Sequence, residues 1–231
     1  TLDRTMLGAL SSTKDVGIYD QALKLLNILL TLVTSLGSVM LPRVSNLLSS
    51  GNQKAVNKLH EMSFLVYNLV IFPMIAGIFL GQDFQDARYA IAIMAFRMFF
   101  IGWTNIMGIQ ILIPHNKNRE FMLSTTIPAV FSVGLNLLLI PPLGYIGASI
   151  VSVATEGLVW FIQLYFTRSY LKEVKIFPSM LKILLAALLM YGALYSVQAF
   201  IHFSSVVNVL IYAVLGFLVY GGLILLLRVL D

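Results

Sequence analysis

Long apolar segments alternate along the chain with short stretches that hold prolines, glycines and charged residues. Each segment has about 19 to 24 residues, which lets a helix cross the roughly 30 Å hydrocarbon core of a bilayer. We expect seven spans, at residues 21–41, 62–80, 90–113, 122–140, 145–167, 180–201 and 206–228. The pattern predicts an all-α, polytopic transmembrane helical bundle, because helices satisfy their backbone groups within lipid. The last two segments are almost wholly aliphatic and are expected at the periphery.

The composition excludes a water-soluble fold. Hydrophobic residues make up 59% of the chain and charged residues 11%, against about 25% charged in ordinary soluble domains. Cysteine is absent, which excludes disulfides, thiolate metal ligands and cysteine nucleophiles. The chain opens with Thr1-Leu2-Asp3 and shows no signal-peptide pattern, so we interpret it as a fragment.

Lysine and arginine are distributed unevenly between alternate connections, which predicts the orientation. One set of connections, which includes 42–60, 114–121, 168–179 and the C-terminus, holds ten cations and four acids. The other set, which includes the segment before the first span and 81–89, holds three cations and five acids. We therefore expect the first set and the C-terminus in the cytoplasm, and the second set outside.

Lys182 and Arg228 lie at the ends of their spans and are counted with the cytoplasmic set, which leaves three charged residues inside the predicted spans: Lys24, Arg97 and Glu156. Lys24 belongs to a polar stripe whose members recur at helical spacing, namely Asp20, Lys24, Asn27, Thr31, Thr34 and Ser38. The stripe favours a face towards a wet cavity, with Lys24, Asn27 and Thr31 as candidate substrate-binding residues. Hydroxyls bonded within their own helix and an Asp20–Lys24 pair near the interface are the alternative.

Arg97 and Glu156 each leave two interpretations open. Arg97 is a further candidate for substrate binding, but its long side chain could also reach the outer headgroups. Glu156 lies at the middle of its span with Ser149, Ser152 and Gln163 along one side. A carboxylate at that depth is costly unless it is paired or protonated, so Glu156 is either a structural partner of a cation or a candidate ion-coupling residue.

Enzymatic chemistry has no visible basis in the sequence. His60, His115 and His202 are expected in three separate connections, and no metal-ligand spacing, phosphate-binding loop or nucleophile motif is present. We expect no catalytic residue, no metal and no cofactor. The basic run 168–182 indicates contact with anionic lipid headgroups of the membrane rather than with nucleic acid.

Several sequence strings resemble the C-terminal lobe of Wzx-type polysaccharide flippases, in the multidrug/oligosaccharidyl-lipid/polysaccharide exporter superfamily. The strings are LDRTMLG (2–8), VGIYDQA (16–22), VMLPRVS (39–45), IPHNK (113–117), LLIP (138–141), GYIGA (144–148) and Thr155-Glu156. The match covers residues 2–168.

This resemblance implies one lobe of a two-lobed transporter that moves lipid-linked oligosaccharides to the outer leaflet of a bacterial plasma (inner) membrane. Residues 1–13 would be the tail of a truncated helix, and the missing N-terminal lobe of the same chain would complete the protein. Lys24 and Arg97 would attract the diphosphate of an undecaprenyl-diphosphate-linked sugar repeat. Family cavities often carry more cations than these two, which could lie in the missing lobe.

The alternative functions are a drug or cation exporter, a membrane glycosyltransferase or acyltransferase, and a seven-helix receptor. A drug or cation exporter of the same superfamily should favour acids in its cavity, whereas the spans here hold two cations and one acid. A membrane glycosyltransferase or acyltransferase would need a clustered carboxylate or histidine set. A seven-helix receptor fits the span count and the outside N-terminus, but the quoted strings argue against it.

Overall fold

The computed structural model describes residues 2–80, 87–174, 176–198, 205–227 and 229, and all regular elements among them are helices. The all-α prediction is confirmed. In chain order the elements are α1 (Leu2–Leu10), α2 (Thr13–Ser49), α3 (Gln53–Leu80), α4 (Arg88–Asn105), the π-helix η1 (Ile106–Leu112), α5 (Asn118–Leu171), α6 (Phe177–Gln198) and α7 (Ser205–Leu226).

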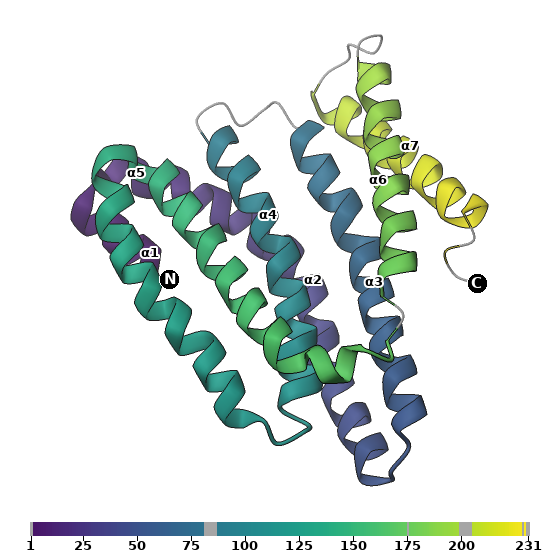
Figure 1. Ribbon diagram of the computed structural model, residues 1–231. Coiled ribbons are helices and arrows are strands. Elements are labelled where there is room, and N and C mark those ends of the chain that lie inside the picture. The colour runs from purple at the N-terminus through teal and green to yellow at the C-terminus, as the bar shows by residue number, and fades with distance from the viewer. Residues whose placement is uncertain (1, 81–86, 175, 199–204, 228, 230–231) are drawn as a thin grey trace.

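The element α5 is a helical hairpin, because the chain reverses at Gly144 (Figure 1). Gly144 has φ 54° and ψ −130°, a conformation that glycine reaches without steric cost. Pro141 and Pro142 lack the N–H groups that would continue the helix. The two arms contain the expected spans 122–140 and 145–167, while α2, α3, α4 with η1, α6 and α7 overlap the other five.

The expected connection 42–60 is largely helical, because both flanking helices continue into it. The helix α2 passes through Pro42 and ends at Ser49, where Gly51 adopts φ 71°. The amides of Gly51 and Asn52 donate to the carbonyls of Leu48 and Leu47, which closes the helix. A loss of hydropathy marks where lipid ends, and it does not mark where a helix ends.

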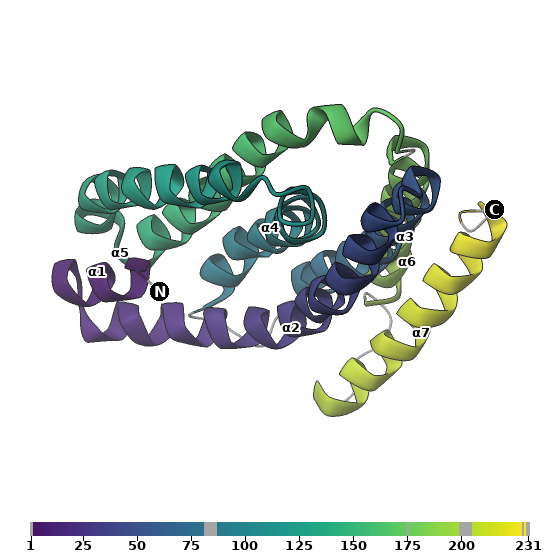
Figure 2. The same cartoon turned by 90° about the horizontal axis from the view of Figure 1, so that it is seen from below.

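The helix α4 lies at the centre of the bundle and packs against α2, α3 and α5 (Figure 2). The hairpin α5 also packs against α1, whereas α6 packs against α3 and α7. Figure 1 shows α6 and α7 at the edge farthest from α1. The expected peripheral position of the last two helices is thus confirmed.

Among the described residues, three helical stretches are long and apolar enough to cross a membrane: Arg88–Leu112, Asn118–Leu171 and Pro178–Val197. The second of these contains both arms of the α5 hairpin. The helix α2 carries the polar stripe, which lowers its mean hydropathy. The chain is a multi-pass membrane protein, while the limits of its seven spans stay a prediction.

Candidate functional site: a polar cavity among α1, α4, η1 and α5

A cavity of about 480 Å³ lies among α1, α4, η1 and the two arms of α5. Its polar lining residues are Asp3, Arg97, Thr104, Asn105, Thr125, Ser132, Ser152, Thr155, Glu156 and Gln163. Empty cavities left by imperfect packing are lined by apolar groups. The charged and polar groups in this lining distinguish the cavity from such a packing defect and make it a candidate polar site inside an apolar helix bundle.

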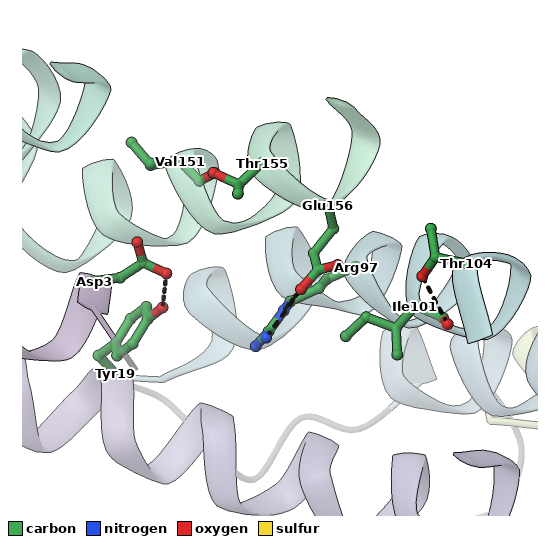
Figure 3. Close-up of polar contacts among 8 residues, drawn as sticks. All are labelled: Asp3, Tyr19, Arg97, Ile101, Thr104, Val151, Thr155 and Glu156. Atoms are coloured by element: carbon green, nitrogen blue, oxygen red, sulfur yellow. Dashed lines mark hydrogen bonds and ion pairs between the residues drawn. The ribbon is translucent and has the colours of Figure 1, made fainter. Parts of the chain in front are cut away.

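Arg97 of α4 and Glu156 of α5 form an ion pair on the wall of this cavity (Figure 3). Glu156 Oε1 lies 3.3 Å from Arg97 Nη2 and 3.4 Å from Arg97 Nε. The two side chains are 15% and 22% exposed, so the pair is mostly buried. The guanidinium thus binds a carboxylate of its own lobe, and Glu156 is paired with a cation, which was the first of its two interpretations.

Asp3 brings α1 into the site, and sequence reasoning missed it. Its carboxylate accepts hydrogen bonds from Asn136 Nδ2 at 2.8 Å and from the Tyr19 hydroxyl at 3.3 Å. Figure 3 shows Asp3 and Tyr19 facing each other beside the Arg97–Glu156 pair. Asp3 was counted among the outer charges, although the expectation of a helix tail at 1–13 already placed it on a helix.

The hydroxyl groups of the cavity wall are held by their own helices. Thr104 donates to the Ile101 carbonyl at 3.0 Å, and Thr155 donates to the Val151 carbonyl at 2.8 Å. At the η1 end, Gln163 Nε2 donates to Ser124 Oγ at 3.1 Å. Gln163 Oε1 is buried and has no hydrogen-bond partner among the described residues, so an acceptor remains available there.

The candidates on α2 lie elsewhere. Lys24, Asn27 and Thr31 are all exposed, and none of them lines the cavity. Thr31 donates to the Asn27 carbonyl at 2.8 Å, whereas Asp20 pairs with Arg4 at 2.7 Å rather than with Lys24. The structure therefore divides the candidates into an exposed face on α2 and the cavity pair Arg97–Glu156.

The charge balance of the cavity differs from that of the predicted spans. The lining holds two carboxylates, Asp3 and Glu156, and one cation, Arg97. The spans hold two cations and one acid, but Lys24 lies outside the cavity and Asp3 lies within it. The cavity is consequently acidic rather than basic.

Three of the cation-rich connections meet at one end of the bundle. Asn57 Nδ2, on α3, donates to Glu173 Oε2, in the segment between α5 and α6, at 2.7 Å. The His115 ring, in the turn before α5, lies 4.2 Å from the ring of Tyr170. Figure 1 shows these connections together at the lower end of the molecule. This arrangement agrees with the alternation of connections used to predict the orientation, but residues 81–86 lie outside the described residues.

The fold and this cavity define a class of protein: a multi-pass helical membrane protein with a polar site inside its bundle. A family model described as "Polysaccharide biosynthesis protein" matches residues 1–85. An Escherichia coli protein named "Putative O-antigen transporter" is 29% identical over 178 residues, which covers 71% of this chain and 42% of that protein. The "Probable low-salt glycan biosynthesis flippase Agl15" of Haloferax volcanii is 22% identical and covers 97% and 50%.

The solved structure of "Lipid II flippase MurJ, inward closed conformation" has the same fold, with a TM-score of 0.77 at 16% identity. The match covers 94% of this chain and 48% of that one. The chain thus spans half or less of the length of these relatives. These findings confirm the resemblance found in the sequence: the chain is similar to flippases and transporters of polysaccharide biosynthesis.

Proposed function

We propose that the chain is the C-terminal lobe of a flippase that moves undecaprenyl-diphosphate-linked oligosaccharide repeat units from the cytoplasmic to the outer leaflet by alternating access. Its place is a bacterial plasma (inner) membrane, with the C-terminus in the cytoplasm. Its partners are membrane lipids and an N-terminal lobe of the same protein. The protein acts as a transporter rather than as an enzyme.

The observation that carries this proposal is the cavity with charged and polar lining residues between apolar helices, in a chain similar to a polysaccharide biosynthesis protein and an O-antigen transporter. A sugar diphosphate needs a path whose polar groups replace the water around its charges and hydroxyls, because unpaired polar groups in hydrocarbon cost several kcal/mol. The polyprenyl tail needs no such path and stays in the lipid.

The residues take distinct roles in this scheme. Lys24 attracts the diphosphate to the exposed face of α2, while Asn27 and Thr31 offer amide and hydroxyl groups to the sugars. Arg97 contacts phosphate after Glu156 releases it. Uptake of a proton or Na⁺ by Glu156 would supply that release, and this is the proposed coupling step.

A drug or cation exporter is the second candidate, and the acidic balance of the cavity favours it. A cationic drug would pair with Asp3 or Glu156, and displacement of Arg97 from Glu156 would accompany its binding. The two candidates differ in the charge of the transported group, so they can be separated by their substrates.

A flipping assay on the full-length protein tests the proposal. Proteoliposomes would hold a lipid-linked oligosaccharide with a terminal sugar that an external glycosidase removes. Without flipping, the glycosidase cleaves only the half of the substrate that lies in the outer leaflet of the vesicles. With the protein present, we expect the cleaved fraction of the substrate to rise from one half towards completion. If the cleaved fraction stays at one half while a lipophilic cationic dye leaves the same vesicles, the protein is an exporter and the flippase proposal is wrong.

A further inference from the structure

The backbone carbonyl of Gln110 lacks a donor within its own helix. In an α-helix this carbonyl would accept from the residue four positions later, which is Pro114 and has no N–H. The next amide, His115 N–H, donates to the Ile111 carbonyl at 3.3 Å. Gln110 lies in η1, where Ile113 N–H reaches back five residues to the Gly108 carbonyl at 3.1 Å.

Two side chains of α3 bind Gln110. His60 Nε2 lies 3.1 Å from the Gln110 carbonyl oxygen, and Ser63 Oγ donates to Gln110 Oε1 at 2.8 Å. All three residues are at least 96% buried. His60 and Ser63 are three residues apart and share one face of α3. A carbonyl can only accept, so His60 is the tautomer with its proton on Nε2.

This arrangement corrects an expectation about His60. The sequence placed His60 at the end of a connection, whereas it lies inside α3 with 1% exposure. The Gln110–Pro114 spacing is the signal that would have pointed to an external donor for the Gln110 carbonyl.

The π-helical conformation of η1 determines which side chains reach the cavity. Arg97, Ile101, Asn105 and Ile109 all line it, and Ile109 lies beyond the start of η1. A π-helical turn contains one residue more than an α-helical turn. Each residue of an α-helix advances about 100°, so loss of this extra residue from the turn would rotate the side chains that follow by about that angle. Such a rotation would turn Ile109 from the cavity and Gln110 from α3.

The geometry points to His60 and Ser63 as positioning residues: by holding Gln110 they keep η1 in its π-helical conformation and so keep Ile109 directed at the cavity. Transport through the cavity rests on the proposed function, but the register of η1 does not.

Cysteine labelling tests the register directly. In the full-length protein with any cysteine outside residues 1–231 replaced, Ile109→Cys would be labelled by a small water-soluble methanethiosulfonate. We expect His60→Leu to slow this labelling about fivefold or more, because the Gln110 carbonyl loses its donor. His60→Gln should keep the rate near the parent's, since a glutamine amide reaches the position of Nε2. Lys58→Leu, on the exposed side of α3, is the control.

Equal labelling of Ile109→Cys in the parent and the His60→Leu background would overturn the inference, as would a His60→Gln rate as slow as that of His60→Leu. If His60→Leu does not fold, Pro114→Ala in the same background supplies the missing N–H and should restore a folded, monodisperse protein. A double variant that also fails to fold would show that His60 acts through another contact. Flipping is measured separately. If labelling of Ile109→Cys depends on His60 as expected but the protein does not flip its substrate, only the proposed function is contradicted.

Discussion

Replacement of Glu156 by glutamine should destabilise the protein, because it leaves the Arg97 guanidinium without its counter-ion. An unpaired cation at the centre of a membrane helix costs about 2.5–3.5 kcal/mol. The Arg97 side chain is 15% exposed to the cavity, and the water there offsets part of this cost, so we expect a loss of about 1–3 kcal/mol. A loss of 2 kcal/mol corresponds to a fall in Tm of about 4–8 °C for a chain of this size.

The two single variants should differ in severity. In Arg97→Gln the remaining Glu156 carboxyl can take up a proton and become neutral, whereas in Glu156→Gln the guanidinium cannot lose its proton. We therefore expect Glu156→Gln to lower the Tm more than Arg97→Gln does. The double variant should be more stable than the sum of the single effects predicts, with a coupling of about 1–3 kcal/mol.

The assay is thermal unfolding of the detergent-solubilised full-length protein, followed by size-exclusion chromatography after heating. All four proteins of the cycle are measured at one pH and in one detergent. Additive losses in the double variant would show that the 3.3 Å contact carries no coupling energy. A Glu156→Gln protein as stable as the parent would refute the reasoning on the uncompensated charge.

Three further predictions concern orientation, the α2 face and helix packing. Lys54→Cys should resist an impermeant thiol reagent in intact cells and react after permeabilisation; labelling in intact cells would reverse the orientation. Lys24→Ala should reduce polysaccharide output at normal expression about tenfold, with Lys24→Arg close to the parent, whereas full output from Lys24→Ala would remove the diphosphate role. Gly102→Ala should lower the Tm by several degrees, because the added Cβ would overlap the Tyr67 ring, whereas Gly134→Ala, which has open space, should not; equal Tm values would contradict the packing.

The helices of the fold follow from the sequence, but their ends do not. Apolar runs identify segments that lipid can accommodate, and the Pro141-Pro142-Leu143-Gly144 turn identifies where α5 reverses. The parts of α2 and α3 that extend into the expected connection 42–60 are polar, so hydropathy assigns them to a connection. Their helical state depends on the local turn at Gly51, where only the three residues 50–52 separate the end of α2 from the start of α3.

The composition of the site follows from the sequence only in part. Periodicity groups residues on one helix, such as Lys24, Asn27 and Thr31, but it cannot show which helices face each other. Arg97 and Glu156 are 59 residues apart, and their pairing depends on how α4 packs against α5. Asp3 was assigned to the outer segment because its charge was counted with a connection. Tertiary packing places it in the cavity instead.

The pairing of Arg97 constrains how an anionic substrate could use this cavity. In this structure the guanidinium contacts Glu156, and the Asp3 carboxylate accepts bonds from Asn136 and Tyr19. A diphosphate that replaced Glu156 at Arg97 would leave an uncompensated carboxylate beside another anion, which is unfavourable in a low-dielectric site. Substrate binding at Arg97 therefore requires that Glu156 become neutral or bind a cation. Linkage makes this reciprocal: the cation that Glu156 takes up must strengthen substrate binding by the same factor by which substrate strengthens cation uptake.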